Sequence, residues 1–228
     1  MSTYLELDYL KLSMIRSFHK YLSLLISIQL LLWTISGIYF AFNKIELIRG
    51  EQYLLNEDVS KLDLTNIKGN FYTKNINILK RLDQWILKVE GESQVYYRTL
   101  NGEELIELNE EEAMETVRQK TSLAPLMAIK INSESRGSEF RGRKLPLYKV
   151  LTESKDNINV YVEAMSGEIA AIRSDSWRTW DFMWGAHIID YRDRDNIDNF
   201  FLKFFSILAL LSAISGIVLF FKTFRLRK

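Results

Sequence analysis

The sequence has no cysteine, two prolines and ten glycines among its 228 residues. The absence of cysteine excludes disulfides, thiolate-bound iron–sulfur clusters and thiol chemistry. Because proline and glycine are few and scattered, no low-complexity linker is predicted. The formal net charge of +1 lacks the excess of basic residues that nucleic-acid binding favours, so no nucleic-acid partner is expected.

Motifs of common catalytic sites are also absent. The chain contains neither a G-x-S-x-G nucleophile motif nor a glycine loop that would cradle a phosphate. The acidic run at residues 110–112 is better explained as a helix N-terminus, where the helix dipole favours negative charge, than as a metal site. We therefore expect no catalytic residue and no metal site, which favours a binding or accessory role over catalysis.

Two long stretches of the sequence, residues 21–42 and 204–221, contain no charged residue. A helix needs about 20 apolar residues to cross the hydrocarbon core of a bilayer, and residues 200–203 lengthen the second stretch. The first stretch is longer than the apolar part of a cleaved signal peptide, and no small-residue cleavage site follows it. The sequence therefore predicts two transmembrane helices surrounded by membrane lipid, the first of them an uncleaved anchor. With no ionisable group inside either helix, transport is the weakest functional reading.

Basic residues flank the two stretches on one side and predict the orientation. Lys11, Arg16 and Lys20 precede the first, and residues 222–228 carry four more basic side chains after the second. Under the positive-inside rule both termini face the cytoplasm, so the middle of the chain lies outside the inner membrane, in the periplasm of a two-membrane bacterium. The predicted order is a cytoplasmic N-terminus (1–20), a first span (21–43), an extracytoplasmic domain (44–176), an interfacial helix (177–191), a second span (200–221) and a cytoplasmic tail (222–228).

The two stretches share one tetrapeptide, ISGI, at residues 35–38 and 214–217. Small residues let membrane helices approach closely. The repeat therefore marks candidate contacts between the two spans or between copies of the chain in a homodimer, with coincidence as the competing explanation.

The middle of the chain alternates strand and helix patterns. The first helix is expected to run on past Phe42 through Lys44 and Glu46, and residues 84–108 then read as a three-stranded β-meander. Its last strand lies at residues 104–108, after the hairpin signal Asn101-Gly102. Asn109 and Glu112 have the spacing of a capping box, which predicts a helix over residues 110–122. Further strands are predicted near residues 126–132, 145–153, 157–165 and 168–174.

Within this region the order helix, strand, long loop and two strands resembles a PepSY domain. The resemblance rests on LPLYKV at residues 145–150 and on VYVEAMSGEI at residues 160–169, where Glu163 and Ser166 replace the aspartate and threonine of the family pattern. SFHK at residues 17–20 and WDFMWGAH at residues 180–187 are similar to the helices of PepSY-associated membrane proteins. Members with more spans include iron-regulated membrane proteins and haem-binding siderophore-iron reductases, and this chain departs from them in having two.

The resemblance implies an α+β membrane protein in which two transmembrane helices flank a PepSY-like antiparallel sheet with a helix. It implies a membrane-anchored module that binds a peptide or partner protein outside the membrane. The alternative is a haem-bearing electron-transfer subunit of an iron-uptake or respiratory system. The basic loop at residues 136–144 is the candidate contact surface, although such a loop is more often simply solvated.

His19 and His187 are the only histidines and are therefore the candidate ligands of a haem b. With His19 at the inner membrane boundary and His187 at the outer, one chain cannot clamp one haem between them. A homodimer or another subunit would have to supply a second ligand. The plainer alternatives are an interfacial role for His19 and a hydrogen bond from His187 to Asp181, to Asp190 or to the extracytoplasmic domain.

Aromatic residues recur at helical spacing just before the second span. One face of a predicted helix carries Trp177, Trp180, Trp184, His187, Ile188 and Tyr191. Indole and phenol rings favour the boundary between membrane and water, which predicts an interfacial helix. Packing of these rings under the soluble domain is the alternative.

Overall fold

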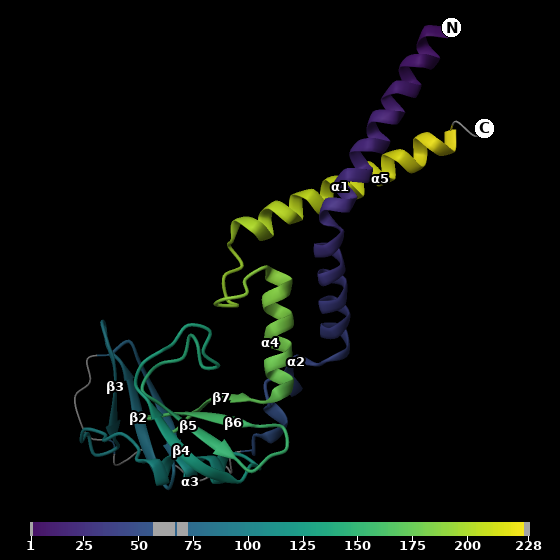
Figure 1. Cartoon of the computed structure of the whole chain (residues 1–228). Helices are drawn as coiled ribbons and strands as arrows, with labels where there is room; N and C mark the ends of the chain where they lie inside the picture. The colour runs from purple at the N-terminus through teal and green to yellow at the C-terminus, as the bar shows by residue number, and fades with distance from the viewer. Residues whose placement is uncertain (1, 57–66, 68–72, 226–228) are drawn as a thin grey trace. The chain divides into compact units, whose positions relative to one another are not determined.

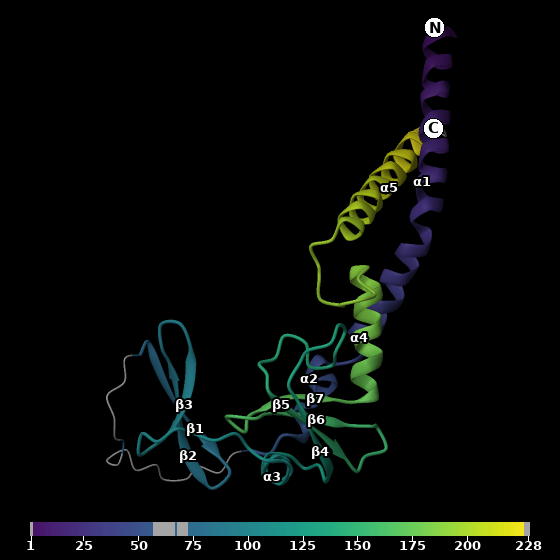
Figure 2. The same cartoon turned by 60° about the vertical axis from the view of Figure 1, so that its left-hand side comes forward.

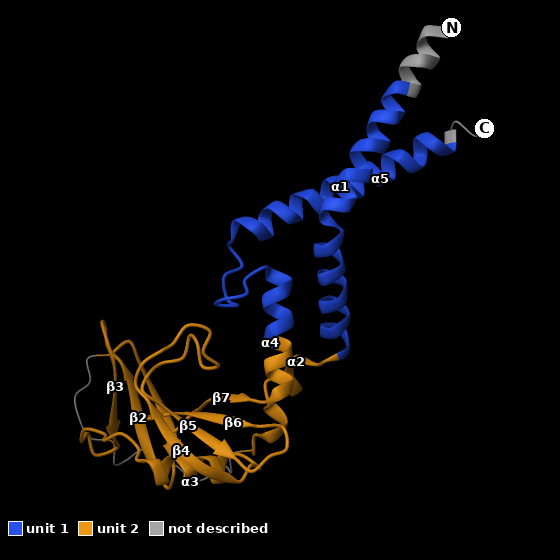
Figure 3. Ribbon diagram, viewed as in Figure 1, with its two compact units in different colours: residues 1–42, 181–228 blue, residues 43–180 orange. Residues whose placement is uncertain are grey.

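The computed structural model describes residues 2–56, 67 and 73–225 of the chain, and describes no side chains for residues 2–9 and 225. The chain forms two compact units, one of residues 1–42 with 181–228 and the other of residues 43–180 (Figure 3). It is an α+β protein with two long apolar helices and two antiparallel sheets, which confirms the predicted class.

The first unit is helical (Figure 1). It contains α1 (Ser2–Phe42), the second half of α4 (Asp175–Ile188), and α5 (Phe200–Arg225). Leu10–Phe42 and Phe200–Phe224 are long and apolar enough to cross a membrane. The predicted continuation of the first helix past Phe42 is wrong. Lys44 is extended, and the chain restarts as the short helix α2 (Ile45–Ile48) followed by the 3-10 turn η1 (Glu51–Tyr53).

One stripe of α1 is buried, and the rest of its surface is exposed. Leu22, Ile26, Gln29 and Ser36 recur every three to seven residues and are all less than a tenth exposed, because this spacing returns to one face of a helix. α5 is one of the elements that contact α1. The opposite face exposes large apolar side chains such as Leu24, Ile28 and Leu31, which is compatible with a lipid environment.

Gln29 is the polar exception on the buried stripe. Its side chain is 7% exposed, and its Nε2 finds no hydrogen-bond partner among the described residues. An unsatisfied buried donor costs about 1–3 kcal/mol. We therefore expect Gln29→Leu, which keeps the volume and removes the donor, to stabilise the helical unit by about 1 kcal/mol.

The measurement is a denaturing-detergent titration of the full-length chain followed by the fluorescence of Trp33 and Trp184. Thr34→Val is the matched control, because Thr34 is exposed and its hydroxyl donates to the Leu30 carbonyl within its own helix. Its midpoint should not move. A lower midpoint for Gln29→Leu than for the unmodified chain would contradict the prediction.

The larger sheet of the second unit has the antiparallel order β4-β5-β6-β7, with β4 (Pro125–Ile131), β5 (Leu147–Thr152), β6 (Asn159–Glu163) and β7 (Ile169–Arg173). The helix α3 (Glu110–Lys120) packs against it and begins with the predicted capping box between Asn109 and Glu112. The buried core comprises residues from this sheet, from α3 and from the segments beside them: Leu108, Ala113, Val117, Ala128, Tyr148, Val150, Ile158, Val160, Val162, Ala164 and Ile172.

The smaller sheet has the order β1-β2-β3 and forms a separate group of strands in the same unit (Figure 2). Its strands are β1 (Asn75–Arg81), β2 (Gln84–Glu90) and β3 (Val95–Thr99). The predicted last strand at residues 104–108 is wrong, since only the isolated bridge between Arg98 and Glu104 forms there. The chain leaves the sheet because Leu108 is buried in the other core and its N–H donates to the Ala164 carbonyl at 2.8 Å.

Candidate functional site

Each serine of the ISGI repeat contacts one of the two histidines. Ser215 Oγ on α5 lies 2.8 Å from His19 Nδ1 on α1, and Ser36 Oγ on α1 lies 2.7 Å from His187 Nδ1 on α4. Ser23 and Ser212 add a second hydroxyl contact of 2.9 Å between α1 and α5. The first copy of the repeat is thus a contact with α4, and the second is the predicted contact between the two long helices.

Both serine hydroxyls also contact carbonyls of their own helix. Ser36 donates to the Leu32 carbonyl at 2.7 Å and Ser215 donates to the Ser212 carbonyl at 2.9 Å. Each hydroxyl therefore links its histidine Nδ1 to the backbone of a long helix. Ser23 Oγ also lies 3.4 Å from His19 Nε2. These contacts orient the rings, and an imidazole held at Nδ1 binds a metal ion through its other nitrogen.

The two histidines belong to separate sites. Ser36 follows His19 by 17 residues on α1, which places the two histidine–serine pairs about 25 Å apart along the helix at 1.5 Å per residue. One haem within one chain cannot use both rings. His19 and His187 as ligands of separate haems, each completed by another subunit, stay a prediction.

His187 lies among aromatic rings. Trp184 stacks with it at a centroid distance of 6.3 Å and an interplanar angle of 5°, and the Phe40 ring lies 5.7 Å away. Trp33 Nε1 donates to the His187 carbonyl at 2.6 Å. The predicted hydrogen bond from His187 to Asp181 or Asp190 is wrong. Asp181 pairs with Arg194 at 2.7 Å, and Asp190 accepts backbone N–H groups of the following turn.

The basic loop at residues 136–144 is anchored rather than wholly solvated. Phe140 is 8% exposed, and Arg141 lies over the Trp177 ring at 5.7 Å. Arg173 lies over the same ring at 4.3 Å. Trp177 therefore packs within the unit of residues 43–180. The interfacial position of the helix at residues 177–191 stays a prediction. Arg143 and Lys144 remain exposed at the end of the loop.

Glu139 is the centre of this anchor. Its carboxylate accepts hydrogen bonds from Arg178 at 2.6 Å, from Tyr161 at 2.9 Å and from Asn159 at 3.3 Å. Burial alone would raise the pKa of Glu139, but these bonds and the charge of Arg178 hold the pKa below its usual value. Burial, with Arg143 nearby, lowers the pKa of Arg173 to about 10.

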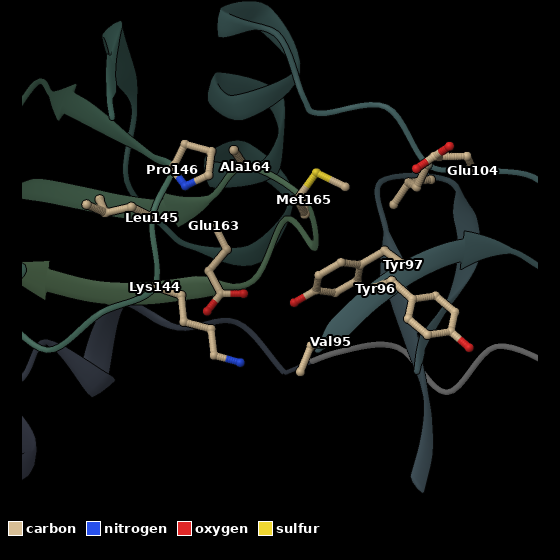
Figure 4. A pocket seen from close by; sticks show the side chains of 11 residues that line it. Val95, Tyr96, Tyr97, Glu104, Lys144, Leu145, Pro146, Glu163, Ala164 and Met165 are labelled. Carbon is tan, nitrogen blue, oxygen red and sulfur yellow. The ribbon is translucent and has the colours of Figure 1, made fainter. Parts of the chain in front are cut away.

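The smaller sheet and the larger one enclose a cleft of about 300 Å³ (Figure 4). Residues 95–97 of β3, residues 104–105, the segment 144–146 and the end of β6 line it. Its apolar lining residues are Val95, Leu105, Leu145, Pro146, Ala164 and Met165, and its charged lining residues are Glu104, Lys144 and Glu163.

The polar groups of the cleft face a common space. In Figure 4 the Tyr97 hydroxyl, the Glu163 carboxylate and the Lys144 ammonium point into the space between the segments. Ser166 Oγ donates to Glu163 Oε2 at 2.8 Å, which holds the carboxylate in place. Burial raises the pKa of Tyr97 to about 12, and Glu163, Glu168 and Glu90 add to the rise. Tyr97 is therefore a neutral hydroxyl donor at pH 7, in an acidic environment.

Sequence reasoning did not identify this cleft. Its two walls come from segments about 40–70 residues apart in the chain, so no local motif contains them. The signal that existed was the resemblance at residues 145–150 and 160–169, because Leu145, Pro146, Glu163 and Met165 all line the cleft.

Comparison of the chain with models of protein families, with curated proteins and with solved structures finds no match. The resemblance to the PepSY family therefore rests on the quoted residues alone and stays a prediction. The candidate site is defined by its own geometry, as a cleft with an apolar lining, two carboxylates, one ammonium and the two phenols of Tyr96 and Tyr97.

Proposed function

We propose that this chain is a membrane-anchored, non-enzymatic binding module. In this proposal α1 and α5 cross the cytoplasmic membrane, both termini are cytoplasmic, and residues 43–180 face outward. The cleft then binds a short segment of a peptide or partner protein. The observation that carries the proposal is the cleft itself, whose apolar lining and few convergent polar groups are typical of binding sites.

The charges of the cleft favour a segment with one basic side chain. Glu104 and Glu163 line it against the single ammonium of Lys144, and Glu90 and Glu168 add negative potential at Tyr97. The apolar residues around Glu163 suit apolar side chains on either side of the basic one. The ligand class is therefore a basic residue flanked by apolar residues.

The edge of β3 limits how such a segment binds. The Leu105 N–H donates to the Tyr97 carbonyl, and the Thr99 N–H donates to the Glu103 carbonyl. These bonds occupy the second half of the strand edge, so a ligand that adds a full strand along β3 is not supported. We propose a short segment that is held mainly by side chains.

The test uses the full-length protein in mild detergent and short fluorescent peptides with lysine, alanine or glutamate between leucine and valine. The lysine peptide should bind most tightly in an anisotropy titration. Glu163→Gln should weaken its binding about tenfold, because a hydrogen bond to a charged group contributes about 1.5–3 kcal/mol. The affinity for the alanine peptide should change little.

Glu92→Gln is the matched control, because Glu92 is exposed on the turn before β3 and does not line the cleft. It should bind the lysine peptide like the unmodified chain. Equal binding of the three peptides, or equal loss in both variants, would refute the proposed role of the cleft. A reporter fused to the C-terminus should be active only in the cytoplasm, and an active reporter outside would refute the orientation.

The second candidate function is haem-dependent electron transfer with a partner. The observation that favours it is the contact of Nδ1 with a serine hydroxyl in both His19 and His187, since an imidazole oriented through one nitrogen can ligate haem iron through the other. The visible spectrum of protein purified from haem-replete cells tests it. A stoichiometric haem band that disappears in His19→Ala or His187→Ala would favour this function, and a colourless protein would eliminate it.

A further inference from the structure

A second cavity, of about 540 Å³, lies between α1 and α5 near their basic ends. Arg16 and His19 line it from α1, and Gly216, Phe220 and Thr223 are among the residues that line it from α5. The lining thus combines a guanidinium from α1 with a hydroxyl and aromatic rings from α5.

Two features of the contact between the helices shape this cavity. A Cβ atom at Gly216 would lie 3.1 Å from His19 Cε1. Any residue other than glycine would therefore push the imidazole ring from its position. The hydrogen bond from His19 to Ser215 holds the ring against α5. The contact of His19 with Ser215 and Gly216 therefore closes the end of the cavity that lies nearest the middle of the two helices.

The charge around the cavity has one sign. Residues 9–42 and 199–228 include no aspartate or glutamate, whereas Lys11, Lys20 and Lys222 lie on the same helices. The nearest acidic residue along α1 is Asp8, about 12 Å from Arg16 at 1.5 Å per residue. Within the described part of the chain, the Arg16 guanidinium has no hydrogen bond or ion pair. It is thus an open donor for an anion.

We infer that this cavity binds the phosphate of an anionic phospholipid. Arg16 and Thr223 donate to the phosphate oxygens, and the rings of Phe220 and Phe224 lie along an acyl chain. A phosphate oxygen pair suits the planar fork of a guanidinium, and a juxtamembrane basic cluster attracts anionic lipid. A free phosphate would leave the apolar wall without a partner, which is why a lipid is the occupant. The inference rests on the membrane anchoring in the proposed function.

The experiment is native mass spectrometry of the full-length protein with phosphatidylglycerol or phosphatidylcholine of identical acyl chains. The unmodified protein should retain phosphatidylglycerol about tenfold more tightly, because the choline ammonium of phosphatidylcholine offsets its phosphate charge and would lie close to the basic side chains. Arg16→Gln should remove that preference. Lys20→Gln is the matched control, because Lys20 is an exposed cation on the same helix that does not line the cavity. It should keep most of the preference.

Four outcomes would overturn the inference. They are equal affinity for the two lipids, an equal loss in Arg16→Gln and Lys20→Gln, displacement of the lipid by inorganic phosphate alone, and a haem band that is lost in His19→Ala. Alkaline extraction of membranes separates this failure from that of the proposed function. Release of the chain from the membrane would refute both the proposed anchoring and the proposed lipid site. Retention in the membrane without a preference for phosphatidylglycerol would refute the lipid site and leave the proposed anchoring intact.

Discussion

Replacing Gly50 with alanine is expected to lower the free energy of unfolding of the unit of residues 43–180 by about 3 kcal/mol. Gly50 has a φ of 80°, in the left-handed region that costs an L-residue about 1–2 kcal/mol. A Cβ built there would lie 2.7 Å from Ile172 Cγ2 and 2.8 Å from Ile172 Cβ. The Cβ of Ile172 is fixed to the buried strand β7, so rotation of the side chain does not remove the clash.

The control for this variant is Gly142→Ala. Gly142 has a similar φ of 71°, but a Cβ built there would have nothing within 4 Å. It should therefore show only the backbone cost, about 1 kcal/mol. The measurement is chemical denaturation of the full-length protein in mild detergent, followed by tryptophan fluorescence. If both variants lose the same stability, the contact between Gly50 and Ile172 is not what requires glycine.

Replacing Glu139 with glutamine is expected to cost about 2 kcal/mol at pH 7. The carboxylate faces Arg178, which also pairs with the more exposed Asp175, in a region that contains further arginines. Without the Glu139 charge, Arg178 keeps the exposed Asp175 as its partner, and Arg173 loses a compensating carboxylate. The side chains of Glu139 and Arg178 remain 25% and 31% exposed, so solvent screening makes the loss smaller than for a fully buried pair.

The pH dependence of this loss has a definite sign. The pKa of Glu139 is lower in the folded protein than its usual value, so its stabilisation is complete above the pKa of the unfolded chain, about 4.3. The stabilisation disappears as the pH falls through the folded value. The difference in unfolding free energy between the unmodified chain and Glu139→Gln should thus be constant near neutral pH and shrink below about pH 4.

Glu153→Gln is the control for the pH series, because Glu153 is exposed at the end of β5. Its effect should stay within about 0.5 kcal/mol across the same range. A difference for Glu139→Gln that grows toward low pH would contradict the sign. A negligible difference at pH 7 would mean that the Glu139 network does not anchor the loop of residues 136–144.

The two proposed sites occur in different units and use different chemistry. The cleft of residues 43–180 carries two carboxylates and one ammonium, and the cavity between α1 and α5 carries a guanidinium with no acidic neighbour. A basic peptide and an anionic lipid are therefore matched to separate places. The peptide titration and the lipid measurement use different ligands, so Glu163→Gln tests the cleft and Arg16→Gln tests the cavity independently.

The sequence by itself determined the features that depend on a few neighbouring residues. The long uncharged stretches lead to the apolar helices α1 and α5, because composition over about 20 residues decides whether a helix is apolar all round. Asn109 and Glu112 determined where α3 begins, since both halves of a capping box lie within one turn. Strand alternation located β4 to β7 within a few residues.

Only the tertiary structure decided which distant groups meet. The pattern at residues 104–108 reads as a strand, but burial of Leu108 in the other core outweighs pairing with β3. His187 bonds to Ser36 across 151 residues rather than to a nearby aspartate, and the walls of the cleft come from two separate segments. Local pattern acts over one or two turns, whereas these contacts depend on how whole elements pack, and packing is a property of the folded chain.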